Sequence, residues 1–183
     1  MRKLYLKQVN TRSSQTATTV RDINGKAEYL VTGNFGREDA FIHVYNNLGQ
    51  LVVELKQTSF GLLPRFNIKF QDEVVGSIGV SLGSLLDVIY VRDLNWFIRG
   101  SLTSGTYYAY HKQSRLMKVK PVKRPNGLFN ELAIKNKSQE PILIGIAVIL
   151  NRWLFNTKPS PLKDILRQPI TFAYSDKITL KNH

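Results

Sequence analysis

Residues 140–155 read Glu-Pro-Ile-Leu-Ile-Gly-Ile-Ala-Val-Ile-Leu-Asn-Arg-Trp-Leu-Phe. Proline is tolerated in the first turn of a helix, so Glu140-Pro141 is typical of a helix N-terminus. Apolar residues then occupy every side of the predicted helix, which indicates either a buried helix or a membrane span. A span needs about 20 such residues, and Asn151-Arg152 interrupts this run far short of that. We therefore expect a helix buried in the protein core.

The chain before this helix has the pattern of short strands joined by polar turns. Five strand–turn–strand units follow one another, at residues 20–31, 44–55, 66–78, 90–100 and 107–120. The first two units are offset by 24 residues and match at Asp22 with Asn46 and at Gly25 with Gly49. Asp and Asn side chains bond to the backbone in turns, and Gly accepts the positive φ of a tight hairpin. These units therefore predict serial β-hairpins.

A serial array of hairpins exposes sheet edges unless the sheet is covered or closes. A period of about 24 residues also occurs in solenoids, but the copies degrade too quickly along the chain for one. We predict a mainly β protein, an antiparallel β-barrel around a central hydrophobic α-helix near the C-terminus. Residues 1–155 would form this barrel domain, with the helix at about 140–155, and residues 156–183 a C-terminal extension.

This order of elements resembles the tubby-like superfamily, in particular the LURP-one-related proteins of bacteria and plants. The likeness covers roughly residues 1–155 and rests on three features: the turns at Asp22 and Asn46, the stretch Leu94-Asn95-Trp96-Phe97-Ile98-Arg99-Gly100-Ser101, and the helix Ile142–Leu150. The resemblance implies a twelve-stranded antiparallel barrel threaded by the helix. Tubby proteins bind phosphoinositides through basic side chains, and phospholipid scramblases are similar in fold. Most bacterial relatives have no established activity, so the resemblance implies the fold more than the function.

The chain departs from this family pattern in two places. Many relatives end soon after the helix, whereas this chain continues to His183. The extension is a candidate to cover the barrel mouth or to contact a partner. Asn151 stands where the resemblance leads us to expect an acidic residue, so we do not assign to this chain any role that such an acid has in the family.

The composition indicates a basic protein without cysteine chemistry. The 183 residues fit one domain, and the absence of Cys excludes disulfides, thiolate zinc sites and cysteine nucleophiles. The 26 Lys and Arg residues against 13 Asp and Glu give a net charge of +13. Such a charge favours anionic partners, namely nucleic acid, an acidic membrane or an acidic protein, although a basic, inert surface would also keep a protein in solution. The first residues lack an apolar signal core, so we expect a cytoplasmic protein, peripheral at the membrane if it binds lipid, without a transmembrane span.

The sequence offers one match to a catalytic motif, Gly79-Val80-Ser81-Leu82-Gly83, which fits G-x-S-x-G. A nucleophile elbow requires a strand–turn–helix context in an α/β sheet, whereas the flanks here have the pattern of strands and loops. The three histidines, His43, His111 and His183, lack helical metal-ligand spacing. We interpret the motif as a chance match and expect neither an enzyme nor a metal site.

The acidic pairs Glu38-Asp39 and Asp72-Glu73 fall in predicted turns. Paired carboxylates do acid–base chemistry only when they face a pocket, and adjacent residues on a loop usually face water. The chain also contains no glycine-rich phosphate loop. We expect no cofactor.

The strongest candidate site is the basic run at residues 112–124, Lys-Gln-Ser-Arg-Leu-Met-Lys-Val-Lys-Pro-Val-Lys-Arg, with six cations and no acid. On a strand, Lys118 and Lys120 project to one face, and the two ammonium groups repel unless an anion such as a phosphate headgroup lies between them. Arg115 and Arg124, expected in the flanking turns, would add bidentate contacts. The candidate anion- and lipid-binding residues are Lys112, Arg115, Lys118, Lys120, Lys123 and Arg124. The alternative interpretation is a solvated strand face.

We predict a non-enzymatic binding module that docks on anionic phospholipid headgroups through this basic strand and loop. The alternative is a nucleic-acid-binding protein that uses the same surface, because Tyr107, Tyr108 and Tyr110 precede the basic run and aromatic rings stack on bases. Aromatic residues suit strand packing equally. A further alternative is a carrier of a small apolar ligand inside the barrel. The helix at 142–150 opposes that idea because it should fill the space.

Overall fold

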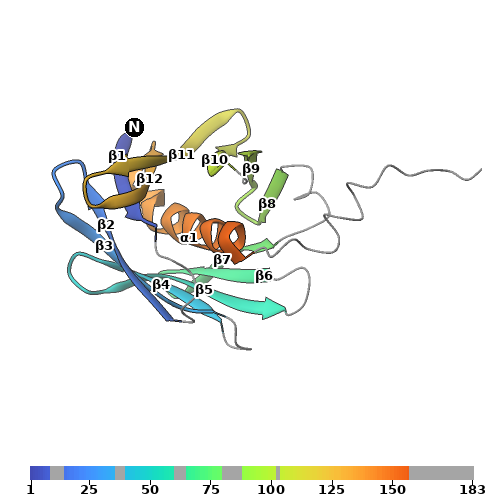
Figure 1. Cartoon of the computed structure of the whole chain (residues 1–183). Coiled ribbons are helices and arrows are strands. Elements are labelled where there is room, and N and C mark those ends of the chain that lie inside the picture. The colour runs from blue at the N-terminus through green and yellow to red at the C-terminus, as the bar shows by residue number, and fades with distance from the viewer. Residues whose placement is uncertain (9–14, 36–39, 60–64, 80–87, 102–103, 157–183) are drawn as a thin grey trace, which may run out of the picture.

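The computed structural model forms a closed antiparallel barrel around one long helix (Figure 1). It describes residues 1–8, 15–35, 40–59, 65–79, 88–101 and 104–156. The strands are β1 Arg2–Lys7, β2 Gln15–Asp22, β3 Ala27–Asn34, β4 Phe41–Asn46, β5 Leu51–Ser59, β6 Arg65–Phe70, β7 Glu73–Gly79, β8 Val88–Arg92, β9 Trp96–Ser101, β10 Thr106–His111, β11 Ser114–Arg124 and β12 Gly127–Ile134. The 3₁₀ turn η2 (Lys137–Gln139) leads into helix α1 (Glu140–Asn156). The predicted fold class and the predicted helix are confirmed.

Each strand pairs with its neighbours in the chain, and β1 pairs with β12 to close the ring. All the pairings are antiparallel, as expected for strands connected by hairpins. Closure removes the exposed edges that an open meander of this length would carry. The barrel is therefore a closed frame on which side chains alternate between the interior and the outer face.

The hairpin turns identified in the sequence form as predicted. Asp22 Oδ1 accepts two backbone N–H groups at 2.9 Å, from two and four residues further along the chain. Asn46 Oδ1 does the same at 3.0 Å. Gly25 and Gly49 adopt φ values of 83° and 76°, where a residue with a Cβ would be strained. The side-chain acceptor and the glycine together fix both turns.

Helix α1 fills the interior of the barrel, which explains why it is apolar on every side. Within residues 142–150 the side chains are buried, except that of Val148, which is partly buried. The helix contacts β4 and β5 most closely. At Gly145 an added Cβ would overlap Leu55 Cδ1 of β5, so the glycine permits this close approach. Among the described residues, no helix has both the length and the hydropathy needed to cross a bilayer.

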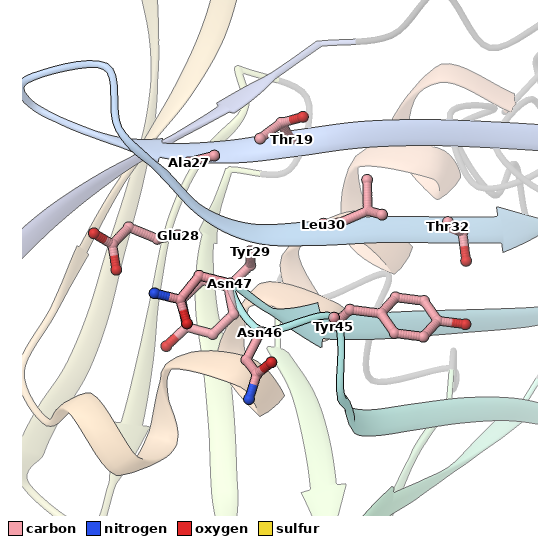
Figure 2. A pocket seen from close by; sticks show the side chains of 10 residues that line it. Thr19, Ala27, Glu28, Tyr29, Leu30, Thr32, Tyr45, Asn46 and Asn47 are labelled. Carbon is pink, nitrogen blue, oxygen red and sulfur yellow. The ribbon is translucent and has the colours of Figure 1, made fainter.

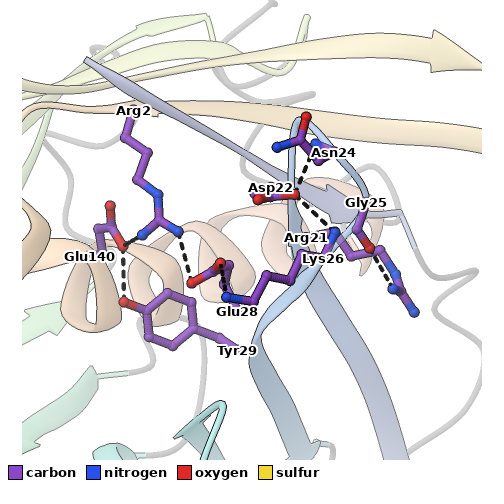
Figure 3. Close-up of polar contacts among 9 residues, drawn as sticks. All are labelled: Arg2, Arg21, Asp22, Asn24, Gly25, Lys26, Glu28, Tyr29 and Glu140. Carbon is purple, nitrogen blue, oxygen red and sulfur yellow. Dashed lines mark hydrogen bonds and ion pairs between the residues drawn. The ribbon is translucent and has the colours of Figure 1, made fainter.

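An ion pair between the buried Glu140 and the partly exposed Arg2 anchors the start of α1 to the barrel wall (Figure 3). Glu140 is fully buried, and its Oε2 accepts hydrogen bonds from Arg2 Nη1 at 2.8 Å and from Tyr29 Oη at 2.9 Å. Arg2 Nη2 also pairs with Glu28 Oε2 at 2.8 Å. The hydrogen bond to Glu28 raises the pKa of Arg2 despite its desolvation, and burial raises the pKa of the Tyr29 hydroxyl. The contacts join the helix to β1 and β3.

Helix α1 ends at Asn156, and the predicted C-terminal extension at residues 156–183 lies, apart from Asn156, outside the described residues, so the predicted domain boundary stays a prediction. Glu38-Asp39, His183 and residues 80–83 of the G-x-S-x-G match also lie outside the described residues. For these segments the sequence interpretation stays a prediction.

Candidate anion-binding face

The basic run forms strand β11 almost in its entirety. Met117 and Val119 face the interior and are fully buried. Lys118 and Lys120 alternate with them and face outward, which confirms that the two lysines share a face. Arg115 and Arg124 lie within the strand rather than in flanking turns, so that part of the prediction is wrong.

The placement of Arg115 has a physical reason in the turn that precedes it. Lys112 adopts a positive φ of 52°, and His111 already pairs with Ser114. Only Lys112 and Gln113 are needed to reverse the chain, so β11 begins earlier than the polar composition suggested. Two-residue hairpin loops of this kind require positive φ, which Asn and Gly signal more clearly than Lys does.

Lys120 already has an acidic partner. Its Nζ lies 3.5 Å from Glu131 Oε1, and Lys3 Nζ lies 3.6 Å from the other carboxylate oxygen. Tyr5 Oη donates a hydrogen bond to Glu131 at 3.1 Å. Burial pushes the pKa of Glu131 up, but Tyr5, Lys120 and Lys3 outweigh it and hold that pKa below its ordinary value. Glu131 of β12 therefore supplies an anion beside Lys120 from within the protein.

The remaining cations of the run occupy different surroundings. The guanidinium of Arg124 lies over the ring of Tyr5, 3.5 Å from its centroid. Lys112 and Lys123 are exposed. Arg124 is thus engaged in a cation–π contact, and Lys112 and Lys123 project into solvent at opposite ends of β11.

Three other cations gather around one tyrosine on the outer face of β9, β10 and β11. Tyr108 of β10 lies directly opposite Arg99 of β9 on one side and Lys118 of β11 on the other. Lys118 Nζ lies 5.7 Å and Arg115 Cζ 5.9 Å from the centroid of the Tyr108 ring. We call these four residues the Tyr108 cluster. No ion pair joins its three cations to an acid within the described residues.

The sequence analysis missed Arg99, because it lies outside the basic run. Its position opposite Tyr108 depends on the pairing of β9 with β10. The signal that could have found it is the period of two in residues 96–99, which places Phe97 and Arg99 on one face, combined with a hairpin that pairs residues 96–101 with residues 106–111. The structure therefore brings Arg99, Arg115 and Lys118 to Tyr108, whereas Lys120 pairs with Glu131, Arg124 lies over Tyr5 and Lys123 is exposed.

A row of aromatic side chains lies beside the Tyr108 cluster. Register places Tyr90 of β8 opposite Phe97 of β9, and Phe97 opposite Tyr110 of β10. Ring centroids are 6.5 Å apart for the first pair and 5.2 Å apart for the second, whose rings are stacked at 13°. Tyr110 also lies 6.2 Å from Tyr108. We call Tyr90, Phe97 and Tyr110 the aromatic row.

The three tyrosines named in the sequence analysis do not act together. Tyr107 points into the barrel and is fully buried, and burial raises the pKa of its hydroxyl. Tyr108 and Tyr110 point outward. Alternation along β10 separates them, so strand packing accounts for Tyr107 and only the other two are available to a ligand.

The other polar candidates are engaged or exposed. His43 Nδ1 lies 3.2 Å from Tyr45 Oη, and His43 Nε2 lies 3.5 Å from Glu54 Oε2. Asp72 is 98% exposed and pairs with Lys69 at 3.2 Å, as expected for an acid in a turn. In the described part of the chain, no three His, Asp or Glu residues are grouped as a metal site would require.

A hollow of about 630 Å³ lies on a different side of the barrel, over β2, β3 and β4 (Figure 2). It is lined by Thr19, Ala27, Glu28, Tyr29, Leu30, Thr32, Tyr45, Asn46, Asn47 and Gly49. The lining contains no cation and none of the predicted site residues. An anionic ligand would find no counter-charge in this lining, so the hollow does not compete with the Tyr108 cluster as an anion site.

Comparison with known proteins finds the same fold in a solved structure. The X-ray structure of a protein from Arabidopsis thaliana, AT5G01750, matches with a TM-score of 0.54 and 14% sequence identity, over 82% of this chain and 91% of that chain. At this identity the likeness concerns the fold alone. No family model and no curated protein matches the chain.

Proposed function

We propose that this chain is a non-enzymatic binding module that docks on anionic phospholipid headgroups through the Tyr108 cluster. The observation that carries the proposal is the gathering of Arg99, Arg115 and Lys118 around Tyr108 without an acidic partner among the described residues. We also propose membership of the LURP-one-related branch of the tubby-like superfamily. The closed barrel, its buried late helix and the fold likeness to the Arabidopsis protein support that assignment.

The chemistry of the cluster suits a phosphate group. A guanidinium presents paired N–H donors that match two phosphate oxygens, and an ammonium adds a compact charge. Three like charges held close together repel one another, and a phosphate between them relieves that repulsion. The strand pairing of β9, β10 and β11 places the three cations on one face of the barrel, so their backbone positions are already set before a ligand binds.

The expected binding energy is modest and depends on charge. A basic side chain close to an acidic membrane surface contributes about 1 kcal/mol. Three cations therefore give about 3 kcal/mol of preference for acidic over neutral membranes. Because this attraction is screened by salt, binding should weaken steeply as ionic strength rises.

Vesicle co-sedimentation tests the proposal, with phosphatidylcholine vesicles compared with vesicles that also contain an acidic phospholipid. The unsubstituted protein should sediment with the acidic vesicles only, and high salt should release it. Reversing two charges in Arg99→Glu/Lys118→Glu should weaken binding by at least about 30-fold, since two attractive terms are lost. The matched control is Lys56→Glu/Arg65→Glu, which makes the same charge change at two exposed positions on β5 and β6.

Three outcomes would contradict the proposal. Equal binding to neutral and acidic vesicles would show that headgroup charge is not recognised. An equal loss in the control variant would show that only net charge matters. Tighter binding to duplex or single-stranded oligonucleotides than to acidic vesicles would favour the nucleic-acid alternative. A finer check compares Lys118→Ala with Lys120→Ala, and the second should matter less because Glu131 neutralises Lys120.

A further inference from the structure

On the outer face of β8, β9 and β10, the aromatic row borders the Tyr108 cluster, whose cations form no ion pair with an acidic residue in the described part of the chain. Tyr90 is 66% exposed, and it is the one aromatic side chain among the large apolar side chains that are exposed in the described part of the chain. Phe97 and Tyr110 are half-buried against each other. Arg115 lies directly opposite Tyr110 at the end of the row. The face therefore combines an apolar strip with a cationic strip at its side.

This combination fits the interfacial layer of a membrane. Tyr and other amphipathic aromatic side chains partition to the headgroup level of a bilayer, where the ring meets the upper acyl chains and the hydroxyl meets water. Basic side chains beside them would contact the phosphates at that same depth. The two strips would thus engage adjacent layers of one surface.

The ring geometry favours this occupant over a stack of nucleotide bases. The Phe97 and Tyr110 rings are nearly parallel, with an interplanar angle of 13° and centroids 5.2 Å apart, so their faces are directed toward one another. The Tyr108 ring is covered by Arg115 and Lys118. A base requires an open aromatic face, whereas insertion among lipid headgroups can use ring edges as well.

We infer that the aromatic row inserts into the interfacial layer of an anionic membrane while the Tyr108 cluster holds the headgroups, an inference that rests on the proposed function. The insertion is shallow. Asp93 lies in the turn that follows β8, three residues after Tyr90. Arg99 and Lys118 lie opposite Tyr108 on its two sides, next to the aromatic row. These charges stay at the level of the headgroups and limit how deeply the rings descend.

Site-specific fluorescence can measure the insertion, since the chain contains no cysteine and a single introduced thiol can be labelled without background. Tyr90→Cys is labelled with an environment-sensitive fluorophore and mixed with acidic phospholipid vesicles. The control is Leu48→Cys, 77% exposed in the turn between β4 and β5. That hairpin lies away from the aromatic row, since β4 is four strands from β8 and six strands from β10 around the ring.

The label at position 90 should shift its emission to the blue, and lipid quenchers near the headgroups should quench it more than quenchers deep in the acyl chains. The label at position 48 should stay in water. In unlabelled protein, Tyr90→Ala/Phe97→Ala should weaken binding to acidic vesicles by about tenfold, with no change in net charge. Leu48→Ala should have no effect. Thermal unfolding of each variant checks that the barrel remains folded.

The outcomes separate the two proposals. If the unsubstituted protein binds acidic vesicles but position 90 stays in water and the double alanine variant binds equally well, the insertion is refuted and headgroup docking stands. If the unsubstituted protein does not bind acidic vesicles, both fail. A change in the label at position 90 with single-stranded oligonucleotides, and not with vesicles, would refute the insertion and identify the row as a base-binding surface.

Discussion

Replacing Arg2 by Ala tests how the central helix is held in the barrel. Glu140 has no exposed surface, and its Oε2 depends on Arg2 and Tyr29 for its hydrogen bonds (Figure 3). Removing the guanidinium leaves a carboxylate in the interior with one neutral donor and no counter-charge. Glu28, the other partner of Arg2, keeps a longer contact with Lys26 at 3.7 Å. The cost should therefore come mainly from Glu140.

The expected magnitude follows from this burial. Breaking a buried ion pair by removing one partner typically costs about 3–5 kcal/mol. Because Arg2 is 31% exposed and Tyr29 still donates to Glu140, we expect Arg2→Ala to cost no more than about 3 kcal/mol, the lower end of that range. Lys3, the next residue on β1, is 50% exposed and lies 3.6 Å from Glu131. Lys3→Ala should cost less than about 1 kcal/mol, as is usual for exposed pairs.

Urea unfolding, followed by far-ultraviolet circular dichroism and by fluorescence, measures both variants. Arg2→Ala should lower the urea concentration at the midpoint by about 1–2 M, and Lys3→Ala by roughly a few tenths of 1 M. Adding Glu140→Gln to Arg2→Ala should recover stability, since no charge is then left buried and Gln can still accept from Tyr29. The reasoning is refuted if Arg2→Ala costs no more than Lys3→Ala, or if the added Glu140→Gln destabilises further.

Two more predictions concern the interior and the acid range. Gly145→Val should destabilise the protein by about 2 kcal/mol, because the new valine side chain would overlap Leu55. Adding Leu55→Ala to this variant should recover part of the lost stability. If the losses of the two substitutions simply add, the two positions do not share this space. The pKa of Glu131 is lowered in the folded state, so its contribution to stability is present above about pH 4.5 and is lost as pH falls through the lowered pKa. Unfolding midpoints measured between about pH 3 and 6 should fall less steeply for Glu131→Gln, and equal slopes would contradict the assignment.

Much of the fold could be predicted from the sequence because its determinants are local. The turns at Asp22 and Asn46 are fixed by a side-chain acceptor and a glycine within five residues of chain. The helix at Ile142–Leu150 is apolar all round, and only a closed shell of other elements can bury every side of it. A hairpin meander supplies such a shell when its first and last strands pair, as β1 and β12 do here.

The candidate site was predicted less well because its determinants are not local. Residues 112–124 contain no acid, yet Glu131 of the next strand neutralises Lys120. Conversely, Arg99 enters the Tyr108 cluster from β9, outside the basic run. Counting charges along one strand identifies a basic strand, but the register between strands decides which of its cations have partners. The sequence predicted Lys118 and Arg115 as candidates and could not distinguish them from Lys120.

One of the register shifts in the barrel, the one between β10 and β11, completes the Tyr108 cluster. On β11, Met117 lies opposite Ala109, and regular pairing would then place Leu116 opposite Tyr110. A register shift between Ala109 and Tyr110 places Arg115 there, while Leu116 and Met117 are both buried. Bulges of this kind redirect a side chain at the cost of one unpaired residue. Here the extra residue brings a third cation to the outer face beside the aromatic row. The β10–β11 hairpin thus packs apolar side chains in the barrel interior and also presents outward the cations without acidic partners on which the proposed docking surface depends.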